Sequence, residues 1–156
     1  MSSILRSSIG LNVRKSLLKV FVWNVALYGS ETWTISRVEK RRLEAFEMWC
    51  YRRMLKVRWV DKVTNEEVLR RIGEKWSLWR HLMQRRDRLV GHILRHDGLV
   101  KIALEGSVWG KNGVGRPRLE YSKQIQEDVG SGSFVEMKRL AQDRLAWRAA
   151  SNQSQD

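Results

Sequence analysis

Residues 79–96 read WRHLMQRRDRLVGHILRH, and this stretch decides the fold that the sequence predicts. Four apolar residues recur at the spacing of one stripe on an α-helix, namely Leu78, Leu82, Leu89 and Ile93. The arginines lie mostly off this stripe, and Arg85 and Arg86 flank it. The pattern predicts a long amphipathic helix whose apolar stripe packs inward and whose cations face a partner or solvent.

Capping signals predict further helices on both sides of this segment. Residues 36–39, 64–67 and 133–136 have the Ser/Thr-x-x-Glu form of a capping box, in which the hydroxyl and the carboxylate each accept a free amide. Gly29, Gly73 and Gly130 follow apolar periodic segments and predict helix ends. A mainly buried helix is expected over residues 11–28, although a strand over residues 20–25 stays open. A short helix over residues 100–104 is also left open.

The expected architecture is all-α, with about six helices in an irregular small bundle joined by short loops. The remaining helices are predicted over residues 37–56, 65–72, 77–96, 117–129 and 134–147. Residues 106–116 contain four glycines and are expected to form a basic loop. The polar tail from residue 151 is expected to be disordered.

Composition points to an anionic partner. The 156 residues carry 30 Lys and Arg against 17 Asp and Glu, which gives a formal net charge of +13. Such a surplus destabilises a compact state by self-repulsion unless something anionic neutralises it. Nucleic acid is the partner that this charge favours, and an anionic membrane surface is the alternative.

Eight residues form the predicted nucleic-acid-binding set, because cationic side chains of this kind contact phosphate oxygens. Five lie on the amphipathic helix and three in or beside the glycine-rich loop: Arg80, Arg85, Arg88, His92, Arg95, Lys111, Arg116 and Arg118. Residues 113–118, GVGRPR, are similar to part of an AT-hook, whose arginines enter the minor groove. A solvated helix face and an ordinary glycine loop are the alternative interpretations.

The eight tryptophans allow a second mode of contact. Aromatic side chains next to cations can stack on the bases of single strands. Most tryptophans of a small helical domain belong to the core, however. Trp59 and Trp109 are the two that the sequence predicts to be exposed.

No catalytic, metal or cofactor site is predicted. The sequence lacks a local Ser–His–acid arrangement and an Asp-rich pair, and residues 106–111 lack the spacing of a phosphate loop. His92 and His96 share a helix face, but a structural zinc needs four ligands, and only His81 and the distant Cys50 are available as the others. Cys50, the only cysteine, is expected to be a buried, inert thiol in a reducing compartment.

Residues 17–28 are apolar but are too few for a helix that spans a bilayer, and no clean cleavage site follows them. The protein is therefore expected to be intracellular, nuclear or cytoplasmic, and not secreted. No membrane partner is expected.

Several blocks in a fixed order carry a family resemblance. They are residues 25–34 (VALYGSETWT), 42–50 (RLEAFEMWC), 53–55 (RML), 63–69 (VTNEEVL), 89–95 (LVGHILR), 115–118 (GRPR) and 143–148 (DRLAWR). Together they resemble the thumb and post-thumb region of the endonuclease–reverse transcriptases of non-LTR (LINE-type) retrotransposons. The resemblance covers residues 17–148.

The resemblance implies a thumb-like N-terminal helix and connection over residues 1–36, a basic helical post-thumb domain over residues 37–150 and a disordered tail over residues 151–156. The palm of that family carries a Tyr/Phe-x-Asp-Asp metal site, which this sequence lacks. The chain is thus expected to be no enzyme on its own. Its expected role is to bind RNA, DNA or a hybrid, with the upstream palm of the parent polymerase as a second partner. The alternatives are an inert remnant of a decayed element and a truncated gene model whose catalytic part lies upstream.

Overall fold

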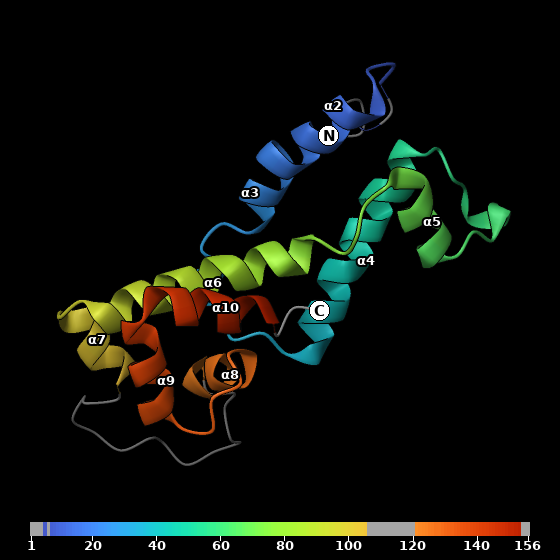
Figure 1. The fold of residues 1–156 in the computed structure, drawn as a ribbon. Helices are drawn as coiled ribbons and strands as arrows, with labels where there is room; N and C mark the ends of the chain where they lie inside the picture. The colour runs from blue at the N-terminus through green and yellow to red at the C-terminus, as the bar shows by residue number, and fades with distance from the viewer. Residues whose placement is uncertain (1–4, 6, 106–120, 154–156) are drawn as a thin grey trace, which may run out of the picture. The chain divides into compact units, whose positions relative to one another are not determined.

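The chain is all-α, as predicted, in a computed structural model that describes residue 5, residues 7–105 and residues 121–153 (Figure 1). No strand occurs among these residues. The chain divides into two compact units. Unit 1 comprises Met1–Tyr28 and Ile35–Leu82, and unit 2 comprises Gly29–Thr34 and Met83–Asp156. The division into residues 1–36, 37–150 and 151–156 follows a family resemblance rather than packing, and it stays a prediction.

Unit 1 contains the N-terminal helices and a helical hairpin. In chain order its elements are α2 (Leu11–Leu17), a π-helix η1 (Leu18–Trp23), α3 (Asn24–Ala26), α4 (Arg37–Met54), a 3-10 turn η3 (Trp59–Asp61), α5 (Asn65–Ile72) and the first turn of α6 (Leu78–Arg95). Its core includes Cys50, which is fully buried. The prediction of a buried cysteine is confirmed, and burial and the charge of Glu47 raise the pKa of its thiol to about 12, which disfavours the reactive thiolate.

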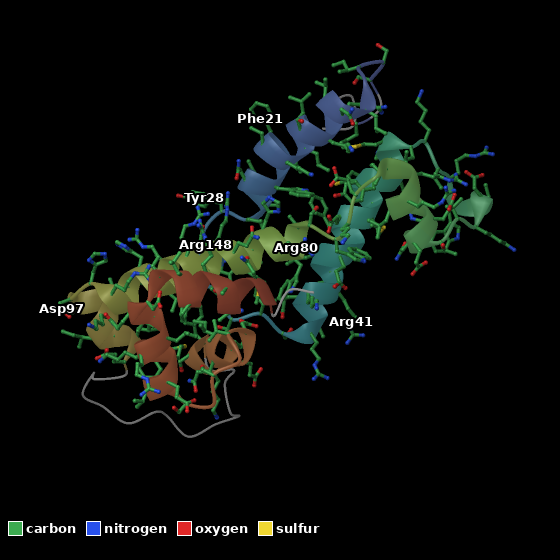
Figure 2. The ribbon with its side chains drawn as sticks, in the orientation of Figure 1. Phe21, Tyr28, Arg41, Arg80, Asp97 and Arg148 are labelled. Carbon is green, nitrogen blue, oxygen red and sulfur yellow. The ribbon has the colours of Figure 1, made fainter. Side chains whose placement is uncertain are left out.

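The N-terminal segment is helical but is not mainly buried, which corrects the prediction. Leu18, Trp23 and Leu27 are buried, whereas Figure 2 shows Phe21 and Tyr28 projecting outward, and both are exposed. The open alternative of a strand over residues 20–25 is excluded, because that part of the chain forms the π-helix and the start of α3. Gly29 then adopts a φ of +67°, a conformation that glycine tolerates without a Cβ clash, and ends the segment as predicted.

The predicted capping residues begin their helices. Ser36 and Glu39 form a reciprocal capping box at the start of α4. Thr64 accepts the amide of Glu67 at the start of α5, but the Glu67 carboxylate binds Arg70 and Arg71 rather than completing the box. Local sequence therefore places these helix starts well, because each cap needs only residues within one turn.

A buried carboxylate anchors the start of α6 within unit 1. Glu47 of α4 is almost fully buried, and its oxygens accept hydrogen bonds from the backbone amides of Ser77 at 3.0 Å and Leu78 at 3.2 Å. The Tyr51 hydroxyl donates to the same carboxylate at 2.8 Å. A negative charge at a helix N-terminus satisfies free amides and interacts favourably with the helix dipole. Residue 47 thus satisfies the amides at this helix start by a long-range contact, which local sequence does not reveal.

Unit 2 packs short helices around the rest of α6. They are the 3-10 turn η2 (Ser30–Thr32), α7 (Leu99–Leu104), α8 (Tyr121–Asp128), α9 (Phe134–Gln142) and α10 (Arg144–Gln153). The core of this unit consists of Val90, Leu94, Ile125, Val129, Met137, Ala141 and Trp147. The open alternative of a short helix near residues 100–104 is confirmed by α7. The glycine-rich loop over residues 106–116 lies outside the described residues.

The C-terminal region forms two helices rather than the single one predicted over residues 134–147. Asp143 breaks the chain between α9 and α10, and its carboxylate accepts the amides of Leu145 and Ala146 at 2.8 and 3.1 Å. Leu145 is consequently exposed instead of lying on the apolar stripe. The helix continues to Gln153 and buries Ser151, so residues 151–153 are helical where a disordered tail was expected.

None of the helices in the described part of the chain is both long enough and apolar enough to cross a membrane.

Candidate nucleic-acid interface

Helix α10 packs directly against α6 in unit 2, because α6 has a glycine at the point of contact (Figure 1). A Cβ on Gly91 would lie 2.6 Å from Nε1 of Trp147, well inside van der Waals contact. The same indole nitrogen donates a hydrogen bond to the backbone oxygen of Asp87 at 2.9 Å. The glycine and the tryptophan thus fix the two helices side by side.

A cleft of about 1280 Å³ runs along this helix pair. Six basic side chains line it, namely Arg85, Arg88, His92, Arg95, Arg144 and Arg148. Its acidic lining residues are Glu31 and Asp87. We call this cavity the arginine cleft. Cations from two helices about 50 residues apart in sequence therefore line one cavity.

Four of the predicted binding residues line the arginine cleft. Arg85, Arg88, His92 and Arg95 are three or four residues apart in turn, so they follow one face of α6. Arg80 belongs to unit 1 and lines a different cavity, of about 550 Å³, beside Trp76. The remaining three predicted residues, Lys111, Arg116 and Arg118, lie outside the described residues.

Sequence reasoning missed the opposite wall of the cleft. Arg144 and Arg148 are four residues apart on α10 and flank Trp147, and both are exposed. Their spacing is a usable signal, because it places two arginines on the helix face adjoining a large apolar residue. That this face lies against α6 depends on a tertiary contact with Gly91, which no local pattern reveals.

Mutual repulsion makes the cleft receptive to an anion. Burial, and then the positive charge of Arg144, lower the pKa of Arg95. Arg95 is held in place by a 2.8 Å hydrogen bond from its Nη1 to the backbone oxygen of Ala141. Arg85 lies 3.9 Å from the Glu31 carboxylate, which offsets part of its charge. An anion bound between the two helices would relieve the repulsion that remains.

Arg86 is buried, although the amphipathic pattern predicted that the cations of this helix face a partner or solvent. Its side chain is only 2% exposed and donates hydrogen bonds to Asp128 and Gln124 of α8. Burial lowers the pKa of this guanidinium, whereas the negative charge of Asp87 opposes the shift. Arginine is the basic residue best suited to a buried pair, because its planar fork can satisfy several acceptors.

The face of α6 that packs inward also differs from the predicted stripe. In unit 2 the buried apolar positions of α6 are Met83, Val90 and Leu94, whereas Leu89 and Ile93 are only half-buried. The buried face is one residue further along the helix, because it accommodates the Arg86–Asp128 pair and the contact at Gly91.

Asp87 lies beneath the arginines as a buried carboxyl group. It is 2% exposed, and burial raises its pKa to about 6, while the charge of Arg86 and the Ser151 hydroxyl oppose the rise. The carboxyl group of Asp87, which lines the arginine cleft, therefore gains its negative charge as the pH rises through a mildly acidic range.

His92 and His96 lie together at the end of α6, as their spacing predicts. Their ring centroids are 4.4 Å apart. Within the described residues, no group of three His, Cys, Asp or Glu side chains could hold a metal ion.

The tryptophans are less buried than predicted. Of the seven in the described residues, only Trp23 and Trp147 are buried. Trp79 is half-buried, with Lys40 Nζ 5.1 Å from its ring centroid. The exposed ones are Trp33, Trp49, Trp59 and Trp76. The prediction of an exposed Trp59 is confirmed, and Trp109 lies outside the described residues.

Comparison with protein-family models, with curated proteins and with solved structures finds no match to this chain.

Proposed function

We propose that the arginine cleft binds the sugar–phosphate backbone of nucleic acid with little dependence on base sequence. The observation that carries this proposal is the convergence of basic side chains from α6 and α10 on one cavity. Five of the six are arginines, whose guanidinium groups donate paired hydrogen bonds to phosphate oxygens. Contacts of this kind position a nucleic acid without reading its sequence.

The charge of the whole chain supports this proposal. A net charge of +13 attracts a polyanion over a distance comparable to the Debye length. Each phosphate that the cleft neutralises releases condensed counterions, so the affinity must fall steeply as salt rises.

We further propose that the chain derives from the thumb and post-thumb region of a LINE-type reverse transcriptase. The ordered blocks over residues 17–148 support this origin. A thumb-derived module would contact a template–primer duplex through its backbone, together with a palm supplied from elsewhere. It would not polymerise alone, because the sequence has no Asp-Asp metal motif. A remnant without a present role would instead show no binding that depends on the cleft.

The test compares two triple variants that remove equal charge. The cleft variant replaces Arg88, Arg144 and Arg148 by alanine, since all three are exposed and leave the Glu31 and Ala141 contacts intact. The control variant replaces three exposed arginines of α4, namely Arg37, Arg41 and Arg42. Figure 2 labels one residue of each set, Arg148 and Arg41.

Fluorescence anisotropy with labelled duplex and single-stranded oligonucleotides at several salt concentrations measures the outcome. We expect the slope of log affinity against log salt to become shallower by about one for each phosphate that the cleft variant no longer neutralises. The control variant should change the slope much less. Salt-independent binding, or an equal reduction in both variants, would refute the proposal.

A further inference from the structure

Trp59 is the most exposed large apolar side chain of the described residues. It is 91% exposed, and the adjacent Val60 is exposed as well. Trp59 belongs to unit 1, and none of the residues that line the arginine cleft is near it in sequence. A tryptophan has a large apolar surface, so full exposure leaves an unusually large hydrophobic area in water.

The loop that carries Trp59 has a defined backbone rather than an open one. The Arg58 amide donates to the Asp61 carboxylate at 2.7 Å, which closes the 3-10 turn η3. Nη2 of Arg52 donates to the backbone oxygen of Val63 at 2.7 Å and ties the end of the loop to α4. These contacts hold the backbone that carries the indole ring in one conformation. The loop therefore loses little conformational entropy when a ligand binds the ring.

Lysines occupy both left-handed positions of this loop, where glycine is the usual residue. Lys56 has a φ of +57° and follows α4 in the same hydrogen-bonding pattern that Gly73 makes after α5. Lys62 has a φ of +46° at the end of η3. A side chain is strained in this region, so a residue other than glycine there has a cost that glycine would avoid.

These lysines and Arg58 flank the tryptophan in sequence and add positive charge to its loop. Both lysines are exposed, and neither ammonium group has an ion-pair partner among the residues that the structure describes. Arg58 is also largely exposed, although it lies 3.6 Å from Asp61. Three cations within three residues of a fully exposed indole form a mixed aromatic and basic surface.

From this surface we propose that Trp59 stacks on an unpaired base of single-stranded nucleic acid, while Lys56, Arg58 and Lys62 contact the neighbouring phosphates. Every base has a π-face, so such stacking tolerates any sequence. In a duplex the bases are already stacked on one another and are not available to the indole. The inference rests on the proposed function, because it assumes that the chain binds nucleic acid, but it concerns a different unit and different residues.

The test uses Trp59→Ala and Trp59→Phe in the full chain, with Val60→Ala as the matched control for a neighbouring exposed apolar residue. The probes are a single strand of about 20 nucleotides, the corresponding duplex, and a strand of equal length in which abasic sites replace the bases. Circular dichroism checks each fold, and no loss is expected because an exposed side chain contributes little to stability.

We expect Trp59→Ala to weaken single-strand binding by about 5- to 150-fold, which corresponds to the loss of one stacked base. Trp59→Phe should retain most of the affinity, and Val60→Ala should retain nearly all of it. Binding to the duplex and to the abasic strand should not change.

Three results would overturn the inference. One is an unchanged single-strand affinity in Trp59→Ala, and another is an equal loss on the abasic strand, which would make the contact a backbone one. The third uses anionic phospholipid vesicles as a further probe: Trp59→Ala weakens binding to the vesicles while its binding to nucleic acid is unchanged, which would assign the loop to a membrane surface. If the wild-type chain binds none of the oligonucleotides, the proposed function fails as well. If only the arginine-cleft variant loses affinity, the proposed function stands and the stacking inference fails.

Discussion

Replacing Asp87 by asparagine should stabilise the protein at neutral pH. The carboxyl group is buried, and this burial raises its pKa from 3.8 to about 6. Each pKa unit corresponds to about 1.4 kcal/mol, so keeping this group ionised in the folded state at neutral pH costs about 3 kcal/mol. Asparagine has the shape of the neutral acid and cannot ionise. The Asp87→Asn variant should therefore gain up to about 3 kcal/mol of unfolding free energy at pH 7.5.

The gain has a definite pH dependence. The folded pKa of Asp87 lies above the unfolded one, so the folded protein holds its proton more tightly. Between about pH 4 and pH 6 the contribution of Asp87 to stability is consequently lost as pH rises, and above pH 6 this loss is complete. The difference between the variant and the wild type should vanish near pH 4 and reach its full value above pH 6.

Urea unfolding followed by far-ultraviolet circular dichroism at intervals from pH 4 to pH 8 measures this difference. Comparing two chains at each pH cancels the titration of every other group. The reasoning is refuted if the variant is less stable than the wild type at pH 7.5, or if the difference does not depend on pH. Phosphate-backbone binding provides a second readout, because a neutral floor beneath the arginines should raise the affinity at pH 7.5 and leave it unchanged near pH 4.5.

Two further substitutions test the packing described above by urea unfolding at one pH. Gly91→Ala places a Cβ against the Trp147 indole and should cost about 1–2 kcal/mol after the gain in helix propensity. Gly98→Ala, with nothing within 4 Å of its Cβ position, should lose only the N-cap preference at the start of α7, which is less than about 1 kcal/mol. Equal effects of the two glycine substitutions would contradict the close contact. Glu47→Ala leaves the amides at the start of α6 without their buried acceptor and should cost about 3 kcal/mol or more. Glu44→Ala, which removes only a partly exposed pair 4.0 Å from Lys40 on the same helix, should cost less than about 1 kcal/mol, and a similar loss in both would exclude the anchoring role of residue 47.

The all-α fold class, and the residues at which most helices begin and end, could be predicted from the sequence because their causes are local. Ser36 and Ser133 each reach an amide three residues ahead, and Gly73 and Gly130 each adopt a positive φ that the chain needs at that point. Such interactions depend on a few consecutive residues, so the sequence displays them directly. The helix break at Asp143 was missed although its cause is also local, because an aspartate can cap a helix or lie on its surface.

The predictions about which side chains of a helix are buried were the ones that most often proved wrong. The burial of Arg86 follows from its pairing with Asp128, 42 residues later, and that of Asp87 from packing under α10. Nothing in the amphipathic pattern of α6 distinguishes these two residues from Arg85 and Arg88, which are not buried. The tryptophans were mispredicted for a related reason, because burial of an aromatic residue depends on whether another element covers it.

The order in which residues occur along the chain has a consequence for synthesis. Every residue of unit 1 precedes Met83, so this unit can fold before the rest has been translated. The arginine cleft, by contrast, needs Arg144 and Arg148 of α10, and α10 lies against α6 through the contact of Trp147 with Gly91. A nascent chain that ended before α10 would have the cations of α6 without the wall that faces them. The capacity to hold a polyanion in the cleft therefore arises only once translation has passed α10, so early-terminated products should lack it.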